Sequence, residues 1–245
     1  MLDFKTKPVI AMLHLQGDSD KEILEKMVEE TEIYYSHGVD AVLVENYFGG
    51  VVNCEQALAW LHKNLPDKLY GVNVLGDYRK GFELAEKYNA GFLQIDSVCG
   101  HLDPIRDHIY AKELISLMNN RSFQVLGGLR FKYQPIKSGR TFERDAELAK
   151  ERCHAVVTTG DRTGKDCPTE KLSEFRNALG NFPLIVGAGV TADTVCEKLK
   201  FADGVIVGSW LKYGHQVYGG DVCEDYVKEF MNKVIEHRKV MYHEF

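Results

Sequence analysis

Short apolar runs alternate with longer amphipathic segments along the whole chain. The apolar runs read almost without polar interruption, which is typical of strands that are buried on both faces in a parallel sheet. We predict strands over residues 8–15, 39–46, 68–75, 91–98, 122–131, 154–160, 182–188 and 202–208.

The segments between these runs have the periodicity of helices that cover a core with one face. In the first of them, Ile23, Met27, Ile33 and Tyr34 fall near one face, with Glu and Lys on the other. We predict helices over residues 19–37, 53–64, 78–89, 103–119, 141–151, 168–179, 191–200 and 221–241. Several begin with a residue that can cap a helix, namely Ser19, Asn53, Asp77, Asp103, Thr141 and Thr191.

Eight strands and eight helices in strict alternation predict parallel pairing with helical crossovers. In a chain of 245 residues, this pattern favours one (β/α)8 TIM barrel spanning residues 1–245. The alternative is a doubly wound open sheet. Two observations count against it: an open sheet needs no eighth unit, and the first strand is not followed by the G-x-G-x-x-G motif of dinucleotide-binding sheets. The chain has no linker, low-complexity stretch or break in composition, so we expect a single domain.

Composition excludes several classes of partner. The formal net charge is -6, so the chain lacks the basic surface typical of proteins that bind nucleic-acid polymers. No apolar run approaches the ~20 residues of a membrane-spanning helix, and the first residues do not resemble a signal peptide. The six cysteines form no C-x-x-C or zinc-finger spacing. We therefore expect a cytoplasmic protein with reduced thiols.

In a (β/α)8 barrel, the active site lies at the C-terminal ends of the strands. Glu45 and Asp96 end the second and fourth strands and are the candidate acid and base, because two carboxylates in one cleft raise the pKa of one of them. Glu45 has the alternative role of a structural partner for Arg130 or Lys132. His14 and Asn73 are expected to assist in proton transfer and orientation, or else to be hydrogen-bonded structural residues.

Other polar residues near the predicted strand ends are candidates for binding the rest of a substrate. Strand alternation places Arg130 and Lys132 on one face, where they would bind an anion, although Lys132 is also a candidate Schiff-base lysine. We expect substrate contacts from Asn46, Arg130, Lys132, Thr159, Asp161 and Thr163.

We expect no cofactor. A divalent metal on His14, Glu45 and Asp96 remains an alternative, although no H-x-H or H-E-x-x-H pair supports it. Cys99 and His101 are a second, weaker alternative, as a nucleophile and its base. The other interpretation is that Cys99 is simply a small buried residue.

Two neighbouring strands near the C-terminus end in glycine turns, "LIVGAGVTADT" (184–194) and "ADGVIVGSWLK" (202–212). In such barrels, phosphate often binds backbone N–H groups after the seventh and eighth strands, at a helix start. We expect phosphate on Gly187, Ala188, Gly189, Gly208 and Ser209, unless the glycines only permit tight turns. A third turn, "TTGDRTGK" (158–165), adds Gly160 and Gly164 as contacts to a phosphate or to sugar hydroxyls, or is a mobile loop.

Five stretches, "GVDAVLVENY", "GVNVLGDY", "AVVTTGDRTG", "LIVGAGVT" and "ADGVIVGSWLK", resemble the BtpA/SgcQ family over nearly the whole chain. The resemblance implies a TIM barrel of the ribulose-phosphate-binding type. The family was named for a role in photosystem I biogenesis, and other members lie among sugar-metabolism genes. The chain departs from the family pattern at "QIDS" (94–97), at Tyr133 in place of a His, and over residues 99–110.

Together these observations predict an isomerase, epimerase or lyase that moves protons on a phosphorylated sugar or nucleoside phosphate. The lyase step would cleave a carbon–carbon or glycosidic bond. The alternative is a non-catalytic assembly or regulatory factor on an enzyme-like barrel. Trp210, Tyr213 and Tyr218 suggest an apolar patch for a homodimer, unless they pack under the last helix.

Overall fold

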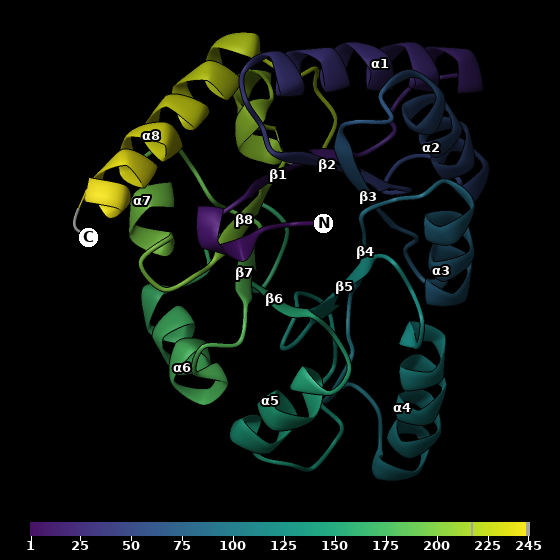
Figure 1. Cartoon of the computed structure of the whole chain (residues 1–245), viewed down its shortest axis with the longest axis vertical. Coiled ribbons are helices and arrows are strands. Elements are labelled where there is room, and N and C mark those ends of the chain that lie inside the picture. The colour runs from purple at the N-terminus through teal and green to yellow at the C-terminus, as the bar shows by residue number, and fades with distance from the viewer. Residues whose placement is uncertain (217, 244–245) are drawn as a thin grey trace.

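The eight strands form a closed parallel barrel in chain order, which confirms the predicted (β/α)8 fold (Figure 1). The computed structural model describes residues 1–216 and 218–243. The ring closes where Val9 and Ala11 pair with Val205 and Val207. The strands are β1 (Val9–Leu13), β2 (Ala41–Glu45), β3 (Leu69–Asn73), β4 (Phe92–Ile95), β5 (Gln124–Gly128), β6 (Ala155–Thr159), β7 (Leu184–Gly187) and β8 (Gly204–Val207).

The helices surround the ring of strands (Figure 1). They are α1 (Asp20–Ser36), α2 (Val51–Asn64), α3 (Tyr78–Lys87), α4 (Pro104–Met118), α5 (Phe142–Lys150), α6 (Thr169–Leu179), α7 (Val195–Lys198) and α8 (Glu224–His243). Short 3-10 turns are η1 (Phe4–Thr6), η2 (Ser209–Leu211) and η3 (Tyr213–His215). Among the described residues, no helix has the length and apolarity needed to cross a membrane.

Most of the predicted helix starts are confirmed. The side chains of Ser19, Asp77, Asp103 and Thr141 each accept the backbone N–H three residues further on. Asn53 is instead inside the first turn of α2, where its Oδ1 accepts the N–H of Gly50 at 2.8 Å.

The seventh helix is much shorter than the predicted 191–200, because the chain first makes a polar turn. In that turn Thr191 and Thr194 exchange side-chain and backbone hydrogen bonds, and α7 begins only at Val195. The predicted cap Thr191 therefore lies before the helix.

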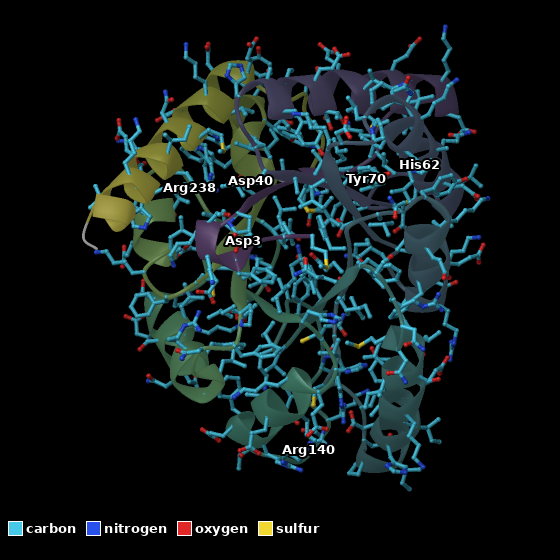
Figure 2. The ribbon with its side chains drawn as sticks, viewed as in Figure 1. Asp3, Asp40, His62, Tyr70, Arg140 and Arg238 are labelled. Atoms are coloured by element: carbon cyan, nitrogen blue, oxygen red, sulfur yellow. The ribbon has the colours of Figure 1, made fainter. Side chains whose placement is uncertain are left out.

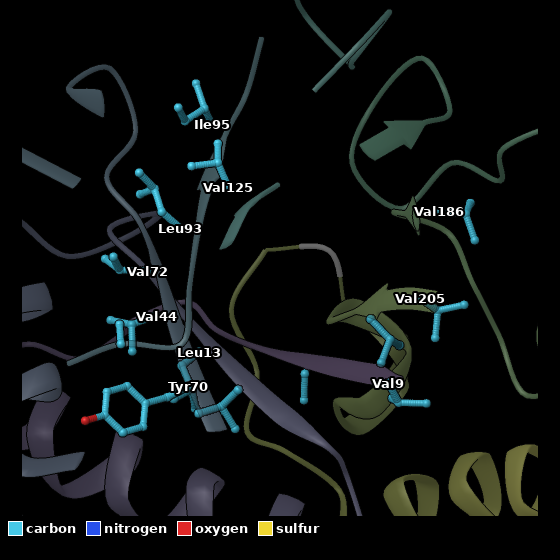
Figure 3. Packing of buried hydrophobic residues seen from close by; sticks show 14 of the residues in the cluster. Val9, Leu13, Val44, Tyr70, Val72, Leu93, Ile95, Val125, Val186 and Val205 are labelled. Atoms are coloured by element: carbon cyan, nitrogen blue, oxygen red, sulfur yellow. The ribbon is translucent and has the colours of Figure 1, made fainter. Parts of the chain in front are cut away.

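Alternation along each strand separates two apolar layers. Outward residues such as Val9, Val44 and Val205 pack in the layer that also contains the helix side chains (Figure 3). Inward residues, including Met12 and Phe92, fill the barrel interior. Burial on both faces explains why the strands read as continuous apolar runs.

The N-terminal segment covers one end of the barrel. Figure 1 shows the N-terminus inside the ring of strands. Leu2 is buried with the interior residues, and its backbone N–H and carbonyl pair with the side-chain amide of Gln124 at 2.7 and 3.2 Å. Only the opposite end, where the strands terminate, is left to form a site.

An ion pair joins the last helix to the start of the barrel. Arg238 of α8 contacts Asp40 at 2.6 Å, and Asp40 also accepts the N–H of Val9 at 2.7 Å (Figure 2). The same guanidinium donates to the carbonyl of Lys7 at 2.8 Å. The pair thus fixes α8 beside the β1–β8 closure.

The fifth strand ends earlier than the predicted 122–131, and this corrects one expectation about the site. The chain leaves the sheet after Gly128, and Arg130 adopts a φ of 48°. Strand alternation therefore does not continue to Arg130 and Lys132, and the two do not share a strand face. A side chain at Gly128 would place its Cβ 1.9 Å from the carbonyl oxygen of Asp96, so only glycine fits there.

Gly71 should be intolerant of substitution, because it makes room for an aromatic ring inside the barrel. A Cβ at Gly71 would lie 2.3 Å from a ring carbon of Phe92, whereas a Cβ at Gly187 would meet its nearest neighbour at 3.5 Å. We expect Gly71→Ala to reduce the free energy of unfolding by about 1–3 kcal/mol in urea titrations. Gly187→Ala is the control and should reduce the free energy of unfolding much less. Equal losses for the two variants would contradict this account of the packing.

Candidate active site

One amide joins the two predicted carboxylates at the open end of the barrel. The Nδ2 of Asn73 donates to Oε1 of Glu45 at 2.9 Å and to Oδ1 of Asp96 at 3.0 Å. These residues end β2 and β3 and follow β4, which are consecutive in the ring. The structure therefore brings Glu45, Asn73 and Asp96 together, as expected from their positions at the strand ends.

Burial is the main cause that changes the acidity of Glu45. The side chain is buried, and desolvation together with the nearby Asp96 carboxylate raises its pKa. Lys132 and the Asn73 hydrogen bond act in the opposite direction, and the resulting pKa is about 7. A carboxyl group with that pKa can both accept and donate a proton near neutral pH.

His14 lies beside Glu45 without forming a hydrogen bond to it. Its Nε2 is 3.9 Å from Oε2 of Glu45, which is too long for a hydrogen bond. Burial, and then the charges of Lys212 and Lys132, lower the pKa of His14 to about 3. The imidazole is therefore neutral at neutral pH. Gly208 leaves space for it, because a Cβ there would lie 2.9 Å from Cε1 of His14.

A cavity of about 130 Å³ lies beside Glu45 and His14, and it reaches the loops after β6, β7 and β8. Eleven of the residues predicted from the sequence line it: His14, Glu45, Lys132, Thr159, Thr163, Gly164, Gly187, Ala188, Gly189, Gly208 and Ser209. The sequence reasoning missed Gln94, Val190 and Thr191 and gave Trp210 another role. Gln94 had a usable signal, since it lies two residues before Asp96 on the same strand face.

The loops after β7 and β8 present hydrogen-bond donors on the cavity wall. Within residues 1–216 and 218–243, the backbone N–H groups of Gly189, Val190, Ser209 and Trp210 have no hydrogen-bond acceptor. The indole Nε1 of Trp210 is also buried without a partner there. Several unpaired donors on one wall form an environment suited to an anion.

Gly160 has a packing role. A Cβ at Gly160 would lie 2.5 Å from the carbonyl oxygen of Asp166, and one at Gly189 would lie 2.3 Å from the carbonyl carbon of Lys165. Gly160 thus allows the β6–α6 segment to fold back on itself, and Gly189 allows the β7–α7 turn to lie against that segment. Lys198 holds this turn through contacts to Asp166 at 2.8 Å and to the carbonyl of Cys167 at 2.6 Å. Gly160 is outside the cavity lining, in contrast to the expected phosphate contact.

Three predicted substrate contacts lie away from the cavity. The Oδ1 of Asn46 accepts the N–H of Leu75 at 2.7 Å, and Asp161 is exposed to solvent. The guanidinium of Arg130 donates to Asp145 at 2.9 Å. The hydroxyl of Thr159 reaches the lining but is engaged, because it accepts the N–H of Lys132 and donates to the carbonyl of Gly160.

Asp145 anchors the segment that carries Lys132. It is fully buried on α5 and accepts hydrogen bonds from Arg130, from Arg140 at 2.7 Å and from Ser138 at 2.9 Å. The β5–α5 segment therefore has a fixed course even though it lacks regular structure. Lys132 consequently reaches the cavity from the side opposite β1 in the ring.

The alternatives that used cysteine or metal chemistry are not supported by the geometry. Cys99 is a small buried residue, which agrees with the other interpretation given for it. Burial raises the pKa of its thiol to about 11, and the thiol lies 3.5 Å from Asp145. Among the described residues, no group of three His, Cys, Asp or Glu side chains is placed to hold a metal ion.

The aromatic residues predicted as a dimer patch have different surroundings. Trp210 stacks on His215 with ring centroids 3.8 Å apart, and both lie near Tyr226 of α8. Tyr213 and Tyr218 are exposed. The homodimer therefore stays a prediction that rests on these two tyrosines.

A closed ring of eight parallel strands, with its polar residues at the carboxyl ends, defines the (β/α)8-barrel class. Within that class the chain belongs to the BtpA family, whose profile matches residues 5–236.

Individual relatives agree with this assignment. A protein of Thermococcus kodakarensis is 32% identical over 238 residues, covering 86% of this chain and 89% of its own. The photosystem I biogenesis protein BtpA of Synechocystis is 25% identical over 230 residues, covering 84% of this chain and 80% of its own.

Solved structures share the fold at low sequence identity. Thiamine phosphate pyrophosphorylase from Pyrococcus furiosus superposes with a TM-score of 0.61 at 14% identity, covering 96% of this chain and 98% of its own. Phosphoribosyl anthranilate isomerase from Thermus thermophilus superposes with a TM-score of 0.61 at 12% identity, covering 94% of this chain and 98% of its own. Identities this low establish a common architecture and leave the reaction open.

The raised pKa of Glu45 predicts a specific pH dependence of stability. The folded carboxyl group binds its proton more tightly than the unfolded one, so its contribution is present below the ordinary pKa of 4.5 and is lost as the pH rises through about 7. We expect Glu45→Gln to gain stability relative to the wild type by roughly 2–3 kcal/mol between about pH 5 and about pH 8, since one pKa unit is worth about 1.4 kcal/mol. Urea titrations at both pH values measure the difference.

Glu32→Gln, on the exposed surface of α1, is the matched control and should show no such trend. A difference between Glu45→Gln and the wild type that stays constant with pH would contradict the assigned acidity.

Proposed function

We propose that the cavity binds a phosphorylated sugar or nucleoside phosphate and that Glu45 moves a proton on it. The observation that carries this proposal is the combination, in one cavity, of unpaired N–H donors with a carboxyl group of pKa about 7. Either feature alone would be compatible with a purely structural role. Together they supply what is needed to hold an anion and to carry out acid–base chemistry beside it.

In this proposal the phosphate accepts hydrogen bonds from the N–H groups of Gly189, Val190, Ser209 and Trp210. Lys132 faces the same cavity and adds a positive charge. The names of two structural neighbours include phosphorylated compounds, thiamine phosphate and phosphoribosyl anthranilate, which is consistent with an anion site on this fold.

Glu45 is the proposed acid and base, and Asn73 keeps its carboxyl group in place. Asp96 is the second carboxylate, and its negative charge favours the protonated form of Glu45. His14 is neutral, so it acts as a hydrogen-bonding group rather than as a cation. These roles suit an isomerisation, an epimerisation, or a bond cleavage that proceeds through proton transfer.

A second candidate is a non-catalytic role in assembly or regulation. It is favoured by the name of the Synechocystis relative, a photosystem I biogenesis protein. In that case the cavity would bind a ligand as a signal or would bind none. Turnover of a bound phosphorylated compound by the wild type separates catalysis from this role.

Lys132 should contribute directly to anion binding. We expect inorganic phosphate to bind the wild type at one site in isothermal titration calorimetry. Lys132→Met should weaken this binding about tenfold or more, because a charged hydrogen bond is worth about 1.5–3 kcal/mol. Lys68→Met removes the same charge at the opposite end of the barrel, just before β3, and should leave the affinity unchanged. Absence of phosphate binding to the wild type would contradict the proposed anion site.

Glu45→Gln should separate catalysis from binding. For any phosphorylated sugar or nucleotide that the wild type converts, as detected by NMR, we expect turnover to fall by about 10²-fold or more. Phosphate affinity should remain, because the N–H donors are intact. A variant that retains full turnover would remove Glu45 from the mechanism, and binding without turnover of any compound by the wild type would favour the regulatory role.

A further inference from the structure

A buried amide in the barrel interior lacks hydrogen-bond partners. Gln94 is the inward residue of β4 below Asp96, and its side chain is only 4% exposed. Among the described residues its amide makes no hydrogen bond, and its Oε1 is inaccessible. Leaving such a group unpaired costs stability, and a barrel interior would pack better with an apolar side chain there.

A second polar residue that lines the same cavity also has an unpartnered atom. Nδ1 of His14 is buried and has no partner in the described part of the chain, and His14 is 7% exposed. Both His14 and Gln94 line the cavity that also contains the phosphate-binding loops. Two unpaired polar groups on one small cavity point to a ligand that supplies both hydrogen bonds.

The barrel topology places Gln94 away from the anion-binding loops. In the closed ring, β4 stands opposite β8, whose loop provides the Ser209 and Trp210 N–H groups. A ligand with its phosphate on those groups would therefore extend across the barrel axis toward Gln94, passing Glu45. The cavity therefore has backbone N–H donors where it meets the loops after β7 and β8. Nearer the barrel axis it has the amide of Gln94, the imidazole of His14 and the carboxyl group of Glu45.

We infer that Gln94, together with His14, binds a hydroxyl group of the ligand and selects sugar phosphates over nucleoside phosphates. This inference rests on the proposed function. A hydroxyl both donates and accepts, so it can satisfy an amide and an imidazole at once. The cavity of about 130 Å³ is close to the ~150 Å³ that accommodates benzene, so a chain of a few hydroxylated carbons fits where a ribose with its base does not.

The test compares the affinity of sugar phosphates with that of inorganic phosphate, by isothermal titration calorimetry. The probes are inorganic phosphate, a series of triose to hexose phosphates, and adenosine monophosphate. We expect at least one sugar phosphate to bind the wild type tenfold or more tighter than inorganic phosphate, and Gln94→Leu to remove that margin while keeping the affinity for inorganic phosphate. Gln94→Asn shortens the side chain by one methylene and should also reduce this difference in affinity. It replaces Gln94→Leu in the test if the leucine variant does not fold.

Thr158→Val is the matched control. The Oγ1 of Thr158 is also buried without a partner, but it lies on the outward face of β6 and does not line the cavity. Both Gln94→Leu and Thr158→Val should raise the midpoint of thermal unfolding, and only the first should reduce the margin. The inference would be overturned if Gln94→Leu and Thr158→Val reduced the affinity margin equally, or if the margin survived in both Gln94 variants. It would also be overturned if no sugar phosphate bound the wild type more tightly than inorganic phosphate, or if adenosine monophosphate bound most tightly of all the probes. Failure of inorganic phosphate to bind the wild type would instead refute the proposed anion site itself.

Discussion

The pairing of β8 with β1 is the constraint on which the rest of the structure depends. Once the ring is closed, every strand must alternate between an interior and a shell of helices, and all eight carboxyl ends meet at one mouth. The N-terminal segment covers the other end through Leu2 and Gln124. His14, Glu45 and Lys132, which follow or end three different strands, therefore line one cavity, while Asn73 and Asp96 lie outside its lining.

That enclosure creates the electrostatics of the site. The same burial that raises the pKa of Glu45 lowers that of His14, because desolvation penalises whichever form is charged. The result is a titratable acid beside a neutral imidazole, with Asn73 joining two carboxylates that would otherwise repel. Keeping such a pair buried costs stability.

Sequence reasoning succeeded where periodicity decides the outcome and failed where the backbone leaves a regular element. The strand ends His14, Glu45 and Asn73 follow directly from alternation, and so does their common location. Arg130 was misplaced because the chain turns away after Gly128, and a positive φ cannot be read from an arginine. The phosphate contacts predicted at the glycine turns stay a prediction. However, Gly160 serves the packing of the Lys165–Asp166 backbone and Gly208 serves the His14 ring, and only folded neighbours distinguish such uses.

The sequence by itself determined a parallel sheet covered by helices, because near-continuous apolar strands alternating with amphipathic helices are buried in that arrangement. Eight such units favoured a barrel, and the pairing of β1 with β8 decided it over an open sheet. It also predicted which end of the barrel gathers the polar residues of the candidate site. Only the tertiary structure decided which polar groups are paired and which are left free. Hydrogen bonding and desolvation depend on neighbours distant in sequence, as when Asp145 accepts from Arg130 while Gln94 has no partner within residues 1–216 and 218–243.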